Sequence, residues 1–214
     1  MDMKTKITVT LFFLCCTHLM FAQTKFSHAE SLIKIGTDIS FLSSDLNAQK
    51  IPLTGIHIGI SPTIPLGHST YFKPEIAFSM KGGRLNYQST FGYFEGDVSY
   101  KINYFEFPMV FGIRPKTHFA IEFGPYTAIK AGGSFSFQGN FASGYANFDR
   151  KDIHDFDFGI VAGIKIGPFG ILYYHGLQEI AATTASRAFL GNSTNHSIQI
   201  CLQRRWFRKF KTEN

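Results

Sequence analysis

Charged side chains recur at alternate positions inside otherwise apolar segments of this sequence. Lys34 and Asp38, for example, have the opposite parity to Ile35 and its apolar neighbours. Because successive side chains of a strand point to opposite faces, this spacing places the charges together on one face. Charges on an enclosed face must pair, since an isolated buried charge is costly, so the pattern predicts a network of ion pairs. Its candidate members are Lys34, Asp38, Lys73, Glu75, Glu106, Glu122, Asp155, Asp157 and Lys165.

Patterns for catalysis or metal binding are weak by comparison. Neither the HExxH spacing nor a paired-cysteine spacing occurs, so no metal and no cofactor are expected. A lipid-modifying hydrolase would need a Ser–His–acid set. His175 is followed by Glu179, and Ser186 and Ser193 lie in the same segment, but the spacing does not assemble them. We therefore expect no enzymatic activity, and ordinary interior or interface roles for the scattered histidines His57, His118, His154, His175 and His196.

Eight segments carry the alternation and are expected to form strands. They cover residues 31–41, 52–61, 70–81, 100–111, 118–130, 152–166, 169–177 and 196–204. The links after the first, third, fifth and seventh strands are long, whereas the other links are short. In an antiparallel up-and-down arrangement all long links then lie at one end, as in outer-membrane barrels with short periplasmic turns. The turn at 112–117 is accordingly expected on the periplasmic side.

The fold class predicted is all-β, an eight-stranded antiparallel up-and-down transmembrane β-barrel. The apolar face should meet lipid, because the other face carries charges of both signs together with the small residues that suit a narrow interior. Side chains can fill an eight-stranded barrel, so no wide pore is expected. A soluble lipocalin-like carrier with its apolar face inward is the alternative. The expected lipid-facing band contains Phe72, Phe78, Phe105, Phe107, Phe111, Phe119, Phe123, Phe156 and Phe158.

The N-terminus is typical of a secretory signal peptide, with Lys4 and Lys6 before an apolar run and Ala22 at its end. Both nearby cysteines would leave with it, so the mature chain keeps only Cys201 and no internal disulfide. The expected organisation is a signal peptide over residues 1–22, an N-terminal lead-in over 23–30, the barrel over 31–204 and a basic periplasmic tail over 205–214. The tail is expected either to contact anionic headgroups or to be solvated, and nucleic acid is not expected as a partner of an exported chain.

Several short motifs add a family resemblance. They are YFEFP at residues 104–108, GPY at 124–126, YYHGL at 173–177, KPE at 73–75 and FSMKGG at 78–83. Through these motifs, about residues 30–203 resemble the PorT-like outer-membrane β-barrel family of Bacteroidetes. The resemblance implies a barrel in the cell outer membrane and supplies no reaction, because most members have no assigned activity. The basic tail after the last strand departs from barrels that end on an aromatic residue.

The function expected from the sequence is a small outer-membrane barrel with a filled polar lumen and a structural, binding or export-accessory role without catalysis. Its expected partners are outer-membrane lipid and an envelope or secretion-machinery protein, and the chain is expected to be monomeric. A lipid-modifying enzyme is the alternative within the same barrel. The aromatic-rich segments 82–99 and 131–151 either serve adhesion or docking, or simply extend the strands beyond the bilayer and pair with each other.

Overall fold

Ten strands and one short helix make up the described part of the chain. The computed structural model describes residues 30–43, 49–88, 95–139, 143–147 and 153–205. The elements are β1 (Glu30–Ser43), β2 (Gln49–Pro65), β3 (Thr70–Pro74), β4 (Ile76–Gln88), β5 (Glu95–Lys116), β6 (Phe119–Gly139), β7 (Ser143–Asn147), β8 (Phe156–Ile166), β9 (Phe169–Glu179), α2 (Thr184–Leu190) and β10 (Thr194–Arg205). Within these residues no helix has the length and apolar character needed to cross a membrane.

The strands form a closed antiparallel ring. Neighbours along the chain pair with each other, and β1 pairs with β10 from Leu32–Arg205 to Ser43–Thr194, which closes the barrel. β3 and β4 act as one barrel strand interrupted at Glu75, where Pro74 faces the region of Pro108 on β5. Neither proline has a backbone N–H to donate, and the N–H of Glu75 instead donates to the carbonyl of Pro108 at 2.9 Å. The predicted eight-stranded antiparallel barrel is confirmed.

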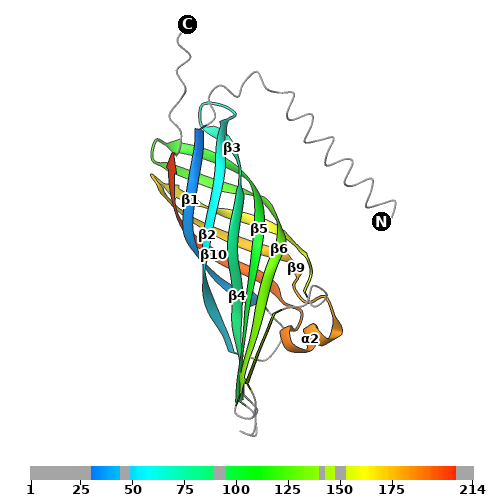
Figure 1. The fold of residues 1–214 in the computed structure, drawn as a ribbon. Coiled ribbons are helices and arrows are strands. Elements are labelled where there is room, and N and C mark those ends of the chain that lie inside the picture. Colours follow the sequence, from blue (N-terminus) through cyan, green and yellow to red (C-terminus); the bar gives the residue numbers. More distant parts are fainter. Residues whose placement is uncertain (1–29, 44–48, 89–94, 140–142, 148–152, 206–214) are drawn as a thin grey trace, which may run out of the picture.

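The two ends of the barrel differ. The end that carries the short connections β2–β3, β5–β6 and β8–β9 is called the turn end, and the opposite end is called the loop end. At the loop end β4, β5 and β6 run on past the other strands (Figure 1), and the start of β2 follows β4 as far as the Gln49–Asn86 pair. This sheet extension consists of residues 83–88, 95–102, 132–139 and β7, which pairs with β6 from Ser134–Asn147 to Gln138–Ser143.

The strands run further at the loop end than the ranges expected from the sequence. For the segments 82–99 and 131–151 two alternatives were open, and their described parts extend the strands and pair with each other, which is the second of them. The segment 178–195 contains α2. The glycines misled the prediction at this point. A Cβ on Gly82 would lie 1.9 Å from the carbonyl oxygen of Tyr100, so this glycine permits a close approach between strands and does not mark a turn. Conversely, strand was expected from 152 onward; residue 152 lies outside the described residues, and among the described ones β8 begins only at Phe156.

Candidate functional site: the lumen and the loop end

Alternation along the strands sends the polar face inward and the apolar face outward. On β8, for example, the exposed Phe156, Phe158 and Ile160 alternate with buried Asp157, Gly159 and Val161. Aliphatic and aromatic side chains are exposed around the whole outer wall. Of the predicted lipid-facing phenylalanines, five are exposed and four are half-buried against neighbours on the same wall; the exposed ones are Phe105, Phe111, Phe123, Phe156 and Phe158, and the half-buried ones are Phe72, Phe78, Phe107 and Phe119.

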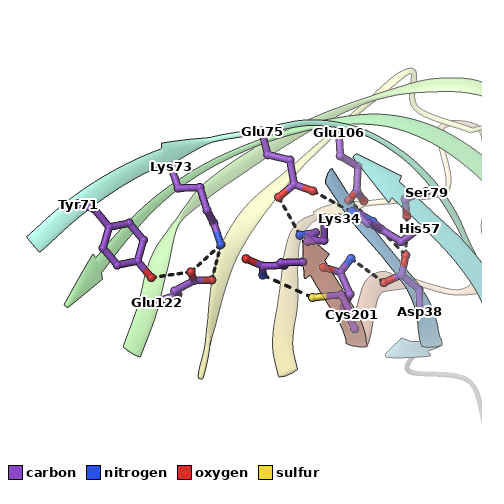
Figure 2. Close-up of polar contacts among 12 residues, drawn as sticks. Lys34, Asp38, His57, Tyr71, Lys73, Glu75, Ser79, Glu106, Glu122 and Cys201 are labelled. Carbon is purple, nitrogen blue, oxygen red and sulfur yellow. Dashed lines mark hydrogen bonds and ion pairs between the residues drawn. The ribbon is translucent and has the colours of Figure 1, made fainter. Parts of the chain in front are cut away.

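The first interior ion pair lies toward the turn end. The ammonium of Lys73 donates to both carboxylate oxygens of Glu122, at 2.6 and 2.7 Å, and the Tyr71 hydroxyl donates to one of them at 2.7 Å (Figure 2). All three residues are buried. The carboxylate thus receives three short hydrogen bonds, which offset the cost of removing it from water.

Tyr71 fits in this position because its ring lies over Gly112 of β5. A Cβ on Gly112 would lie 2.0 Å from Cζ of Tyr71, so no larger residue fits without moving the ring. We expect Gly112→Ala to lower the free energy of unfolding by about 1–3 kcal/mol through overpacking. The measurement is a urea titration of the folded band on unheated gels. Gly132→Ala is the matched control, because a Cβ there would meet nothing within 4 Å; equal losses in the two variants would contradict the packing argument.

A second group lies in the middle of the lumen around Glu75. Its two carboxylate oxygens contact the Lys34 ammonium and Nε2 of His57, each at 2.8 Å. Nδ1 of His57 lies 3.6 Å from one carboxylate oxygen of Asp38, which also accepts a hydrogen bond from Ser79 at 2.9 Å, and the other oxygen of Asp38 accepts one from Gln199 at 3.0 Å. Figure 2 shows the labelled members converging from β1, β2 and β3–β4, and Gln199 joins them from β10. One connected network therefore ties four barrel strands together.

The third group lies closer to the loop end. Lys81 pairs with Glu106 at 2.5 Å, and its ammonium lies over the rings of Tyr174 and Tyr126, 4.4 and 5.0 Å from their centroids. Cations bind favourably to the faces of aromatic rings. Asp157 accepts a longer hydrogen bond from the Asn195 amide at 3.3 Å, and the same amide donates to the Tyr104 hydroxyl at 3.0 Å.

Seven of the nine predicted network residues are buried inside the barrel, namely Lys34, Asp38, Lys73, Glu75, Glu106, Glu122 and Asp157. Lys165 is half-buried and lines a hollow of about 360 Å³ at the turn end, together with Arg114 and His118. The prediction was wrong for Asp155: its side chain is 54% exposed and pairs with Lys130 at 3.2 Å, because it precedes the first residue of β8. Sequence reasoning did not assign the hydrogen-bond partners His57, Tyr71, Ser79, Asn195 and Gln199, although their inward parity was a usable signal.

Near the loop end the lumen becomes apolar. The loop-end cluster consists of the buried residues Leu42, Leu85, Val98, Tyr100, Ile102, Ile153, Ile180, Ala181 and Leu190. The two connecting segments that contribute to it are tied by backbone hydrogen bonds, from His154 to Ile180 at 3.0 Å and from Ile180 to Ser193 at 2.8 Å. The inner face of the sheet extension is therefore packed against the connection that carries α2. The polar-lumen prediction holds for the middle of the barrel but not for this end.

The residues of the sequence-suggested triad are engaged separately. The Ser186 hydroxyl belongs to the capping box of α2 with Thr183, and Glu179 pairs with Arg187 at 3.1 Å. His175 contacts His196. No group of three or more histidine, cysteine, aspartate or glutamate side chains within the described ranges is arranged to hold a metal ion. The described residues therefore form a filled, ion-paired interior, and the candidate residues Ser186, His175 and Glu179 are not assembled into a Ser–His–acid set.

Comparison with known proteins identifies the barrel type. The family model for the outer membrane protein beta-barrel domain matches residues 21–182, which is most of the chain. The chain belongs to this family. Membership places the barrel in the outer membrane, and its strands span the bilayer with the apolar wall toward lipid. The alternative of a soluble carrier with an inward apolar face is thereby set aside.

Individual proteins are only distantly similar to this chain. No curated protein is significantly similar to it in sequence. Among solved structures, Neisserial surface protein A shows 9% identity and a TM-score of 0.47, covering 83% of this chain and 99% of that one. Ail, the attachment invasion locus protein of Yersinia pestis, shows 12% identity and a TM-score of 0.40, covering 82% and 99%. The structure of Ail in complex with the heparin analogue sucrose octasulfate shows 13% identity and a TM-score of 0.38, with the same coverage of both chains. At these values the likeness supports no functional argument.

Proposed function

We propose that this outer-membrane barrel is a non-catalytic scaffold that presents the sheet extension to a partner protein outside the membrane. The loop end faces the exterior and the turn end faces the periplasm. The finer expectations belong to this proposal: export by a signal peptide, PorT-like membership within Bacteroidetes, a monomeric barrel, and an envelope or secretion-machinery protein as partner. The observation that carries the proposal is the length of the strands at the loop end.

Strand length exceeds what the bilayer requires. A barrel strand crosses the membrane in about 9–11 residues, whereas β5 has 22 residues and β6 has 21. At about 3.3 Å per residue, β5 alone is roughly 70 Å long. The outward face of β5 changes character along this length, from Phe111 and Phe105 to the exposed Lys101. The extra length of these strands therefore suits contact with water rather than with lipid.

The sheet extension has an ordered polar outer face. The guanidinium of Arg84 donates to the Ser99 hydroxyl at 3.0 Å, and the Asn86 amide donates to the Asp97 carboxylate at 2.7 Å. Its inner face is held by the loop-end cluster. A surface fixed in this way loses little conformational entropy on binding, which favours recognition of a partner.

Photo-crosslinking on intact cells tests this function. A benzophenone amino acid replaces Arg84 or Lys101 on the extension, and Ile58, exposed on the lipid-facing wall, is the matched control position. We expect one discrete adduct with a different protein from the two extension positions and no protein adduct from Ile58. No adduct from the extension, or an adduct with a second copy of this chain only, would contradict the proposal.

Two further measurements test the proposed orientation of the barrel and its proposed lack of catalysis. The variant Lys101→Cys should react on intact cells with a membrane-impermeant maleimide, because the extension is proposed to be external and the native Cys201 is buried. Protection of this cysteine until cells are lysed would reverse the proposed orientation. The lipid A mass profile should be unchanged in a deletion strain, whereas a loss of a modified lipid species would favour the enzyme alternative.

A further inference from the structure

Two polar groups converge on one ring nitrogen of His196 at the outer wall of the barrel, outside the lumen network. His196 of β10 lies directly opposite His175 of β9 in the register, and their Nδ1 atoms are 3.2 Å apart. The Tyr173 hydroxyl lies 2.8 Å from the same Nδ1 of His196. These groups share the outward face with Ile198 and Ile200, on the loop-end side of the apolar wall.

Hydrogen bonding alone cannot satisfy this arrangement. An imidazole nitrogen either carries one proton or offers one lone pair, so Nδ1 of His196 can form one good hydrogen bond. Two groups nevertheless approach it within bonding distance. The ring itself is held in place, because His196 is only 7% exposed and stacks on Phe41 with centroids 5.6 Å apart. The crowding at Nδ1 is thus a property of a fixed ring.

The distance between the two imidazoles matches metal coordination. Zinc binds histidine nitrogen at about 2.0–2.1 Å, so two nitrogens at a tetrahedral angle lie roughly 3.3 Å apart. The remaining ring nitrogen of His196, Nε2, lies 3.0 Å from the Thr194 hydroxyl. A metal-bound histidine typically donates its other N–H to such an oxygen, which fixes the tautomer and leaves Nδ1 free to bind.

We propose that His175 and His196 bind a divalent transition-metal ion of the zinc type through their Nδ1 atoms, with the Tyr173 hydroxyl beside the ion and water in the open positions. Imidazole ligands suit zinc and copper. The ion would link β9 to β10 at the end of the barrel where the connection that contains α2 begins. This inference does not depend on the proposed partner-binding function.

The test uses the full-length barrel, folded in detergent and freed of metal with EDTA. Titration with Zn²⁺ by calorimetry should show one ion per chain. We expect His175→Ala and His196→Ala each to weaken binding at least tenfold, and Thr194→Val to weaken it by about 10–100-fold, as for other groups that orient a ligand. His118→Ala, an exposed histidine at the turn end, is the control and should bind as the native chain does. Absence of saturable binding, or an equal loss in the control, would overturn the site.

A second measurement needs no variant and so does not depend on folding of the substituted chains. Electron paramagnetic resonance of the native barrel with one equivalent of Cu²⁺ counts the nitrogens that bind the ion. Two equivalent imidazole nitrogens are the expected result, and one or none would contradict the proposal.

Zn²⁺ should also raise the urea midpoint of the native chain, because an ion that binds only the folded state stabilises it. It should leave the urea midpoint of His175→Ala unchanged.

Discussion

Replacing Lys73 with methionine is expected to lower the free energy of unfolding of the barrel by about 3–5 kcal/mol, because it leaves the Glu122 carboxylate buried without its cation. The carboxylate keeps only the hydrogen bond from Tyr71 at 2.7 Å. Neither Lys165 nor Arg114 forms an ion pair with Glu122 in the described structure, so no other cation is in place to compensate. The measurement is the fraction of compact, heat-modifiable protein against urea concentration in lipid vesicles.

Removal of both charges provides the control for this result. The double variant Lys73→Met/Glu122→Leu should recover most of the loss, since a buried ion pair and an apolar pair of similar volume are often close in stability. Some loss should persist because the Tyr71 hydroxyl then has no acceptor. Lys116→Met, an exposed lysine at the end of β5, should stay within about 0.5 kcal/mol of the native chain. A double variant no more stable than the single one would contradict the pairing argument.

Replacing Leu85 with alanine is expected to loosen the loop end, with a cost of about 2–5 kcal/mol for the packing of the loop-end cluster. Leu85 is only 1% exposed, and the cavity left by the lost side chain would adjoin the connection that carries α2. The amide of Ile180, which donates to Ser193 at 2.8 Å, should then exchange its hydrogen at least tenfold faster.

Leu66→Ala is the matched control for the loop end, because Leu66 is 60% exposed at the turn end. It should leave the exchange of the Ile180 amide unchanged. Exchange in the mid-barrel strands should also be unchanged in Leu85→Ala, because the lumen ion pairs do not involve the loop-end cluster. Faster exchange throughout the barrel would show that the cluster and the lumen unfold as one unit.

Strand parity, together with the alternation of long and short links, predicted the fold and the side of the wall on which most of the charges lie. Lys34, Asp38 and Glu122 are inward because the two-residue period of a strand leaves no other choice once one face meets lipid. Parity fails only beyond the end of a strand, as at Asp155, where the alternation was extended past Phe156. The sequence was therefore informative on which way a charge points within a strand, but not on where the strand ends.

The pairing of side chains within the lumen could not be predicted from the sequence. Gln199 meets Asp38 across 161 residues, and Asn195 meets Tyr104 across 91. Such contacts depend on the stagger between neighbouring strands, which the period of a single strand does not encode. The convergence at His196 has the same origin, because His175 and His196 become neighbours only through the register of β9 and β10.

The closing strand β10 also has a kinetic consequence for the newly made chain. It supplies Gln199 to Asp38 and Asn195 to Asp157, and it completes the backbone ladder of β1 at the opposite end of the sequence. A chain that lacks β10 therefore leaves Asp38 and Asp157 without these amide donors in an open, unpaired sheet, a state that lipid does not accommodate. Contacts this distant in sequence form slowly. The interior network is therefore complete, and insertion favoured, only once β10 has paired with β1.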